Sequence, residues 1–180
     1  GQKWLLGPSG TGALYIRRDM IPHVRPAKVS SHAALSFDQK GHLEENTEST
    51  EKYHLTTTSV PLWAGFVEAI KFNLAAGPSD IEKRVLALAA MTKMELLKIS
   101  GVTILSPLEG SGCTGLVSFE IDGIAPDEIV AQLWRTTRIV ARSVDYPACI
   151  RLSLCYFNTE AEIHQVVAAI TSLSRATHKG

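Results

Sequence analysis

The chain has 180 residues, of which 45% are hydrophobic and 20% charged, enough for one domain with a core or for two small lobes. Its 18 Lys and Arg residues balance 18 Asp and Glu residues, so no general basic field attracts nucleic acid or anionic lipid. No apolar run is long enough to cross a bilayer, and the first residues lack the pattern of a signal peptide. We expect a soluble protein without nucleic-acid or membrane partners.

The cysteines and histidines bear on the redox compartment of the protein and on metal binding. Cys113, Cys149 and Cys155 are too few and too unevenly spaced for a disulfide framework, and an odd thiol would be left over. A reducing cytoplasm fits this pattern. The six histidines never pair at the i, i+3 or i, i+4 spacing of metal ligands, so we expect no metal site.

The first third of the chain carries weak structural signals. It opens on Gly1 without an initiator Met, which predicts a fragment of a longer protein. Residues 14–16 form a short apolar run between a glycine turn and charges, as a brief strand does. Residues 21–58 are polar with little periodicity, and we expect a long connecting loop there.

Two helices follow. Pro61 opens an apolar pattern of helical period that ends before Gly77. Ser79 and Glu82 then form a capping box, with Ser79 as the expected N-cap of a helix over residues 81–99.

The remaining pattern predicts a ββαββα unit. We expect strands over residues 102–105, 115–121, 139–143 and 149–154, and a helix over 126–135. In the second strand Val117, Phe119 and Ile121 share one face. Thr159 and Glu162 form another capping box that opens the last helix. The predicted class is α+β, with a mainly antiparallel sheet covered by helices.

The glycine-rich segment 7–12 does not by itself indicate a nucleotide site. A P-loop needs Gly-Lys-Ser/Thr at the start of a helix, whereas this segment leads towards the predicted strand, so tight turns are the better interpretation. Lys3, beside Trp4 and ahead of these rigid turns, has a fixed backbone. Burial would lower its pKa and allow its amine to attack a bound carbonyl group.

Two motifs carry a family resemblance. Residues 1–16, which run Gly-Gln-Lys-Trp-Leu-Leu-Gly-Pro-Ser-Gly-Thr-Gly-Ala-Leu-Tyr-Ile, resemble the pyridoxal-phosphate lysine segment of class V aminotransferases. That group includes cysteine desulfurases, cysteine/cystine C-S lyases and isopenicillin N epimerase-like proteins. Residues 149–163, Cys-Ile-Arg-Leu-Ser-Leu-Cys-Tyr-Phe-Asn-Thr-Glu-Ala-Glu-Ile, resemble the family's C-terminal Arg-x-Ser and Asn-Thr-x-x-Glu signature. Both motifs occur in the family's order.

The resemblance implies the C-terminal half of a fold type I enzyme that depends on pyridoxal 5'-phosphate (PLP) and is α/β overall. Residues 1–20 would be a remnant of the large PLP-binding domain, 21–60 a connecting segment, and 61–180 the linking helix and the small domain. The missing part would supply the aspartate for the pyridine nitrogen and most phosphate ligands, so this chain alone is expected to be inactive.

Site residues are also implied by the resemblance. Lys3 matches the lysine that binds PLP covalently and then moves the Cα proton as acid and base. Gln2 stands where many members have a histidine on the cofactor phosphate. Thr57 resembles the threonine that reaches the partner subunit's cofactor in a homodimer. Arg151 matches the arginine that holds the substrate α-carboxylate, which suits a planar two-pronged donor.

The cysteines separate the subfamilies. Desulfurases carry a nucleophilic cysteine on a flexible loop before the Arg-x-Ser motif, whereas residues 142–148 leave neither that loop nor a cysteine in it. Cys149 and Cys155 are interpreted as buried structural thiols, and Cys113 as more exposed but outside the expected loop. The sequence therefore favours C–S β-elimination of an amino acid over desulfurase, epimerase or aminotransferase activity.

A non-catalytic interaction module of the same ancestry is the second hypothesis. It rests on the truncated start, on Gln2, and on Lys52-Tyr53-His54, which replaces the family's usual Arg-Phe-Glu.

Overall fold

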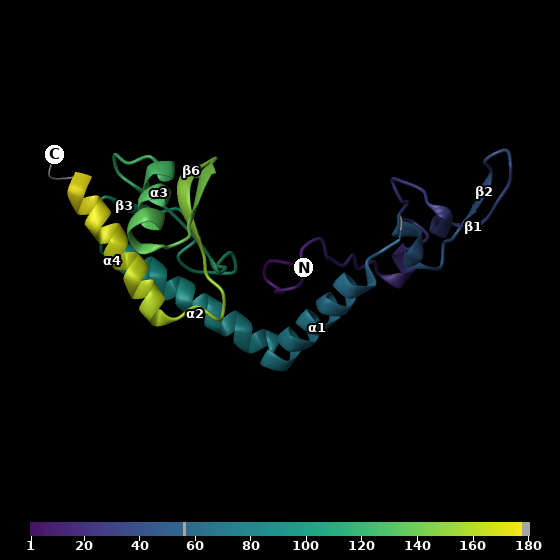
Figure 1. Cartoon of the computed structure of the whole chain (residues 1–180), viewed down its shortest axis with the longest axis horizontal. Helices are drawn as coiled ribbons and strands as arrows, with labels where there is room; N and C mark the ends of the chain where they lie inside the picture. Colours follow the sequence, from purple (N-terminus) through teal and green to yellow (C-terminus); the bar gives the residue numbers. More distant parts are fainter. Residues whose placement is uncertain (56, 178–180) are drawn as a thin grey trace. The chain divides into compact units, whose positions relative to one another are not determined.

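A computed structural model describes residues 1–55 and 57–177 and divides the chain into two compact units, Gly1–Ala75 and Ala76–Gly180. The order of helices and strands matches the predicted one from the first long helix onward, and Figure 1 shows them in chain order.

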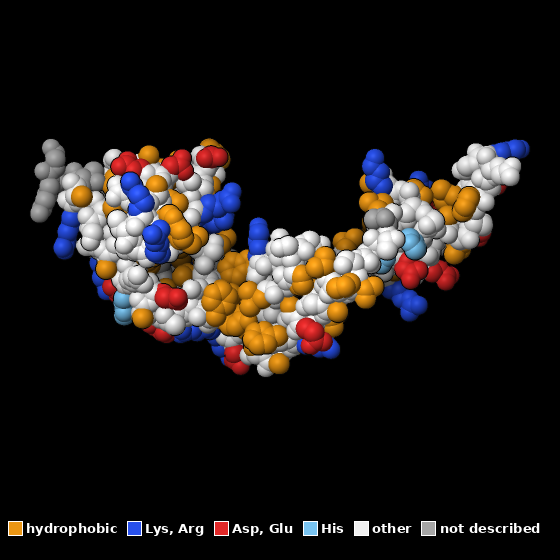
Figure 2. Space-filling model, in the orientation of Figure 1, with side chains coloured by type: hydrophobic (Ala, Val, Ile, Leu, Met, Phe, Trp, Pro, Cys, Tyr) orange, Lys and Arg blue, Asp and Glu red, His pale blue; other side chains and the backbone are white. Residues whose placement is uncertain are grey.

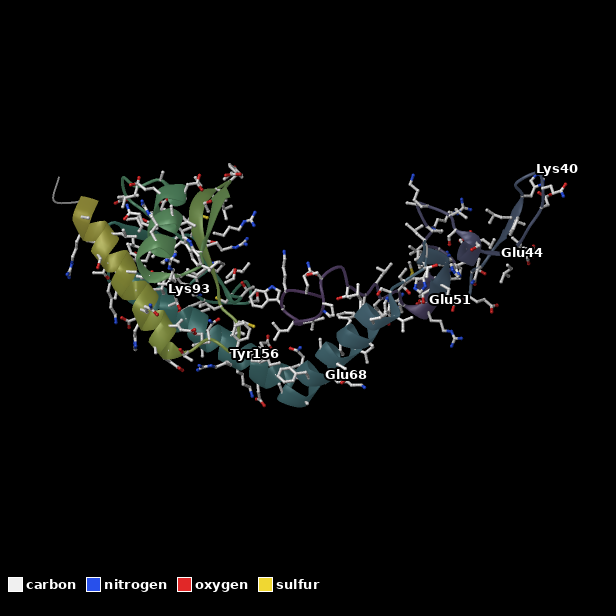
Figure 3. All side chains as sticks on the ribbon, viewed as in Figure 1. Lys40, Glu44, Glu51, Glu68, Lys93 and Tyr156 are labelled. Atoms are coloured by element: carbon white, nitrogen blue, oxygen red, sulfur yellow. The ribbon has the colours of Figure 1, made fainter. Side chains whose placement is uncertain are left out.

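The first unit contains short elements and one long helix. These are the 3-10 helices η1 (Arg18–Met20), η2 (Ser31–Ala33) and η3 (Thr50–Tyr53), the antiparallel strands β1 (Ala34–Phe37) and β2 (Leu43–Glu45), and the helix α1 (Val60–Ala76). Lys40 lies at the tip of the β1–β2 hairpin, where the amides of Lys40 and His42 both donate to the Asp38 carboxylate at 2.9 Å (Figure 3).

Two expectations for this unit are wrong. Residues 14–16 form no strand, and Leu14 and Tyr15 are 68% and 86% exposed, because no described strand lies beside them to complete a ladder. Residues 21–58, expected to be a long connecting loop, carry the hairpin and two 3-10 helices.

A buried lysine organises this segment. The Lys52 side chain is fully buried, and its Nζ donates to the Ile21 carbonyl oxygen at 2.6 Å and to Glu45 Oε1 at 2.9 Å. The hydrogen bond from Lys52 lowers the pKa of the Glu45 carboxyl below its ordinary value. Lys52 of η3 is thus joined to β2 and to Ile21, the residue after η1, through contacts that span up to 31 residues of sequence.

Helix α1 begins at Val60, one residue before the predicted start, and is apolar on several sides. Phe66 is buried, while Val60, Trp63 and Phe72 are 76%, 46% and 60% exposed. Figure 2 shows hydrophobic side chains gathered over α1. A helix with so wide an apolar surface is normally covered by further protein.

The second unit is a four-stranded sheet with helices. Its elements are α2 (Pro78–Leu96), β3 (Val102–Ile104), β4 (Leu116–Ile121), α3 (Pro126–Thr137), β5 (Arg142–Asp145), β6 (Ala148–Ser153) and α4 (Glu160–Thr177). The sheet order is β3-β4-β6-β5, and every neighbouring pair is antiparallel. The expected α+β class, with an antiparallel sheet covered by helices, is confirmed.

The core of this unit lies between the sheet and its helices. Val117, Phe119 and Ile121 of β4 are buried on the predicted face, with at most 3% exposed. From the helices come Leu88, Leu96, Ile129, Leu133, Ile163 and Ile170. The other face of the sheet carries Ser118 and Arg151, which are paired across β4 and β6.

Two boundaries in the second unit differ from prediction. The N-cap of α2 is Gly77 rather than Ser79, because Gly77 adopts a φ of 86° and its carbonyl oxygen accepts from the Asp80 and Ile81 amides. Strand β5 begins at Arg142 rather than at residue 139, since Arg138 ends α3 in the left-handed conformation and pairing starts only at Arg142.

The last helix begins as predicted. The Glu162 amide donates to Thr159 Oγ1 at 3.2 Å, and the Thr159 amide donates to Glu162 Oε2 at 2.8 Å. This reciprocal pair is the predicted capping box.

Candidate active site

Lys3 opens a tight turn in the first unit. The Leu6 amide donates to the Lys3 carbonyl oxygen at 3.1 Å, and the Gly7 amide donates to that of Gly1 at 3.0 Å. Leu6 adopts a φ of 57°, in the left-handed region that non-glycine residues seldom occupy. The Lys3 side chain is exposed, so the described residues supply neither the burial expected for it nor a hydrogen bond to its amine.

The loop that carries Lys3 is seated closely on α1. A Cβ atom at Gly7 would lie 2.9 Å from a ring carbon of Phe66, and one at Gly65 would lie 2.8 Å from Pro8 Cγ. Both distances are too short for real carbon contacts, so the two glycines let the loop and the helix approach. The glycine-rich segment forms a turn, as predicted, in which the Thr11 amide donates to the Pro8 carbonyl oxygen at 3.3 Å, and it packs against α1.

Gln2 and Thr57 belong to the same unit as Lys3. Gln2 is exposed and lines, with Gly1 and residues 3–5, an open hollow of about 330 Å³. Thr57 is exposed in the segment between η3 and α1. Within the described residues no side-chain hydrogen bond restrains the Thr57 hydroxyl group. Amide and hydroxyl donors are thus available, while Lys3 is the one side-chain cation among the residues that line the described hollow.

Arg151 lies on β6 in the second unit, on the sheet face opposite the hydrophobic core. Its Nε atom is buried and has no hydrogen-bond partner in residues 1–55 and 57–177. A buried guanidinium nitrogen without a partner costs free energy unless an acceptor arrives from outside. A carboxylate ligand would satisfy it with two parallel hydrogen bonds.

Sequence reasoning missed a second arginine beside it. Arg142 of β5 lies directly opposite Arg151 of β6, so both side chains project from the same face of the sheet. No ion pair joins either arginine to an acidic residue within the described ranges. The signal lay in the sequence as a nine-residue spacing across a tight hairpin, but only the correct strand register places the two arginines opposite one another.

The rest of the C-terminal motif has a structural role. Asn158 Oδ1 accepts from the Cys155 amide at 2.8 Å, and Asn158 Nδ2 donates to Glu162 Oε2 at 3.2 Å. Arg84 of α2 donates to the Asn158 carbonyl oxygen at 3.0 Å and pairs with both oxygens of Glu160. The side-chain hydrogen bond that Arg84 donates to the Glu160 carboxylate lowers the pKa of Glu160 from 4.5 to about 2. Together these contacts fix the segment that follows β6.

None of the three thiols lies in the β5–β6 turn. Asp145 pairs with Ala148, so only residues 146 and 147 form that turn. Cys149 and Cys155 are buried, as predicted. Cys113 is half-buried, and its Sγ lies 3.5 Å from Nζ of the buried Lys93 and 3.4 Å from the Pro107 carbonyl oxygen (Figure 3 labels Lys93 on α2).

Among residues 1–55 and 57–177, no group of three or more His, Cys, Asp or Glu side chains is arranged to hold a metal ion. No helix among these residues is long and apolar enough to span a membrane.

The described residues fit PLP in part. The Lys3 amine is exposed and has no partner among the described residues, as bond formation to an aldehyde requires, and two backbone hydrogen bonds close the adjacent turn. Gln2 and Thr57 bring neutral hydrogen-bond donors suited to phosphate oxygens. A phosphate group with two negative charges needs more hydrogen-bond donors than Gln2 and Thr57 provide.

Comparison with known proteins identifies the relatives. The sequence profile of the aminotransferase class-V family matches residues 1–166. Isopenicillin N epimerase of Amycolatopsis lactamdurans is 26% identical over 97% of this chain and 46% of its own length. A probable cysteine desulfurase of Xylella fastidiosa (strain 9a5c) is 29% identical over 95% of this chain and 42% of its own length.

Solved structures agree with these sequence matches. The cystine C-S lyase C-DES, in complex with its reaction product cysteine persulfide, matches with a TM-score of 0.80 and 26% identity, over 94% of this chain and 44% of that one. A C-DES mutant structure holds glycine covalently linked to its PLP cofactor. These matches confirm the expected fold, the C-terminal part of a fold type I PLP-dependent enzyme. The chain spans about half the length of the curated relatives it matches, and it belongs to the aminotransferase class-V family.

Proposed function

We propose that this chain supplies the cofactor lysine and the carboxylate-binding arginine of a PLP-dependent enzyme that cleaves a C–S bond of an amino acid by β-elimination. The observation that carries the choice of reaction is the two-residue β5–β6 turn, which has no cysteine and no length to carry a thiolate to a substrate sulfur. Elimination needs no protein thiol.

Each residue has a defined task in this proposal. Lys3 Nζ holds the cofactor and, once released, takes the proton from the substrate Cα. Arg151 binds the α-carboxylate through two hydrogen bonds and so orients the bound substrate. PLP, when bound, supplies the electron sink for the charge left on Cα. The electron pair of the Cβ–S bond then departs with sulfur.

Other residues complete the cofactor and substrate sites. We assign Gln2 to the cofactor phosphate and Thr57 to the phosphate of a partner subunit's cofactor, which makes the active enzyme a homodimer. Arg142 adds a second guanidinium beside Arg151, suited to a substrate with more than one acidic group. Cystine, the substrate named for C-DES, has two carboxylates and a C–S bond.

The same proposal divides the chain into domains. Residues 1–20 are the end of a large cofactor-binding domain, residues 21–60 are a connecting segment, and residues 61–180 form the linking helix and the small domain. The 180-residue chain alone is then inactive, because residues outside it provide the remaining cofactor contacts. A reducing cytoplasm is the proposed location, consistent with the three free cysteines.

The test uses the holoenzyme that contains this chain, with Lys3→Ala and the exposed control Lys71→Ala. Borohydride reduction should attach PLP to Lys3 in the control and not in Lys3→Ala, as read by mass spectrometry. Incubation with cystine should release pyruvate and ammonia only where Lys3 is present. Alanine with a protein-bound persulfide would indicate a desulfurase, a D-amino acid an epimerase, and an unchanged cofactor spectrum in Lys3→Ala a non-catalytic module.

A further inference from the structure

Lys3 has no side-chain partner among the described residues, so its direction is set by the backbone of its own turn. That backbone contains an unfavourable element, because Leu6 adopts a φ of 57°. A left-handed non-glycine residue is unfavourable and persists only where surrounding contacts hold it. Some group must therefore stabilise the turn.

One buried polar side chain makes this contact. Asn73 of α1 is 8% exposed, and its Nδ2 donates to the Leu5 carbonyl oxygen at 3.0 Å and to the Ala69 carbonyl oxygen at 2.8 Å. Leu5 lies inside the turn that Lys3 opens, two residues after Lys3. Asn73 thus connects helix and turn across 68 residues of sequence.

The geometry explains why an amide occupies a helix position that otherwise suits an apolar residue. The peptide unit between Leu5 and Leu6 takes its orientation from the left-handed φ of Leu6, and its oxygen faces α1. A carbonyl oxygen that faces a helix rather than water needs a donor there. The Asn73 amide supplies that donor at this part-buried position when the peptide unit has this orientation, and so favours the left-handed conformation of Leu6.

We infer that Asn73 is a positioning residue that fixes the Lys3 turn on α1 and thereby sets the direction of the Lys3 amine. The inference rests on the proposed role of Lys3. Packing of Gly7 on Phe66 and of Pro8 on Gly65 locates the loop, whereas the hydrogen bond from Asn73 selects the conformation of the turn.

The test compares Asn73→Asp with the unchanged chain and with Lys71→Ala, an exposed change two residues away on α1. An aspartate has the same shape and loses the donor at neutral pH. We expect amide hydrogen exchange at Leu6 and Gly7 to accelerate about five- to tenfold in Asn73→Asp, the loss of one hydrogen bond. Exchange in β4 and β6 should stay unchanged, as should exchange at both turn amides in Lys71→Ala.

Two further readouts separate positioning from general stability. Below about pH 4 the introduced carboxyl is neutral and can donate again, so its difference from the unchanged chain at the same pH should shrink. Borohydride trapping with added PLP should give a smaller ratio of Lys3 product to Lys71 product in Asn73→Asp. If Asn73→Asp fails to fold by circular dichroism, Asn73→Ser, which is too short to reach Leu5, replaces it.

Each outcome decides something. Equal exchange at Leu6 and Gly7 in both chains would overturn the inference and leave the packing of Phe66 and Pro8 as the sole restraint. Faster exchange throughout α1 would also overturn it, because Asn73 would then stabilise the helix rather than the turn. If exchange at the turn is faster but Lys3 has no role in the holoenzyme, the proposed function is refuted while the structural role of Asn73 stands.

Discussion

Arg142 lies directly opposite Arg151 on the neighbouring strands β5 and β6, and among the described residues neither guanidinium pairs with a carboxylate. Like charges at directly opposite positions of an antiparallel pair destabilise it by about 0.2–1 kcal/mol. Their juxtaposition is unfavourable in the free protein and becomes favourable when an anion binds both.

Arg142→Gln should therefore raise the stability of the chain in low-salt buffer by about that amount. Malonate, with two carboxylates, should raise the unfolding temperature of the unchanged chain more than that of Arg142→Gln. Thermal unfolding followed by circular dichroism measures both effects. Arg135→Gln, at the exposed last turn of α3, should not stabilise, because a cation there complements the helix dipole. An equal malonate effect in all three chains would contradict a shared anion site.

The pair of Arg84 and Glu160 predicts a stability difference that depends on pH. Hydrogen bonding to Arg84 lowers the pKa of Glu160 from 4.5 to about 2, so the folded state binds this proton less tightly than the unfolded state. The resulting stabilisation is complete above about pH 4.5 and is lost as the pH falls to about 2. Glu160→Gln should lower the urea midpoint at pH 7 and approach the unchanged chain near pH 2. A difference of constant size across this range would refute the assignment.

Removal of the Lys52 amine should loosen the first unit. In Lys52→Met the Ile21 carbonyl oxygen and Glu45 lose their shared donor, and the unsatisfied carbonyl oxygen of the buried Ile21 alone costs about 1–3 kcal/mol. Limited proteolysis should then cut within residues 21–55 at lower protease concentration. Lys71→Met, which removes an exposed pair with Glu68, serves as the matched change and should leave the cleavage pattern as it was.

The capping box of α4 should contribute measurable stability. Thr159→Ala removes the acceptor for the Glu162 amide and should cost about 1 kcal/mol. Ser172→Ala, at an exposed position within the same helix, is the control and should change the free energy of unfolding little. Urea denaturation followed by the helical circular dichroism signal gives both values. Equal midpoints for the two variants would mean that the box adds nothing.

Local signals account for most of what the sequence predicted correctly. The Thr159–Glu162 box and the alternation of Val117, Phe119 and Ile121 depend on neighbours within a few residues, and both occur as predicted. The prediction that Ser79 is the N-cap of α2 was wrong because Gly77, two residues earlier, already follows the end of the preceding helix and caps the next one in a left-handed conformation.

Long-range contacts account for what the sequence did not reveal. The hairpin at residues 34–45 lies in a segment whose order depends on Lys52, and the partner of Lys52 at Ile21 is 31 residues away. Arg142 becomes a candidate site residue only because the strand register places it opposite Arg151. Of the candidate site, Lys3, Gln2, Thr57 and Arg151 followed from motif resemblance, and their roles stay predictions.

The contact between Pro8 and Gly65 limits how this sequence can change over time. A Cβ atom at position 65 would lie 2.8 Å from Pro8 Cγ, and apart from its own helix backbone and chain neighbours the described residues place only atoms of Pro8 within 4 Å of it. Replacement of Gly65 becomes acceptable once Pro8 has been lost, and a substitution at 65 that arises first is selected against. The two positions should therefore covary among natural relatives, with proline at 8 found together with glycine at 65.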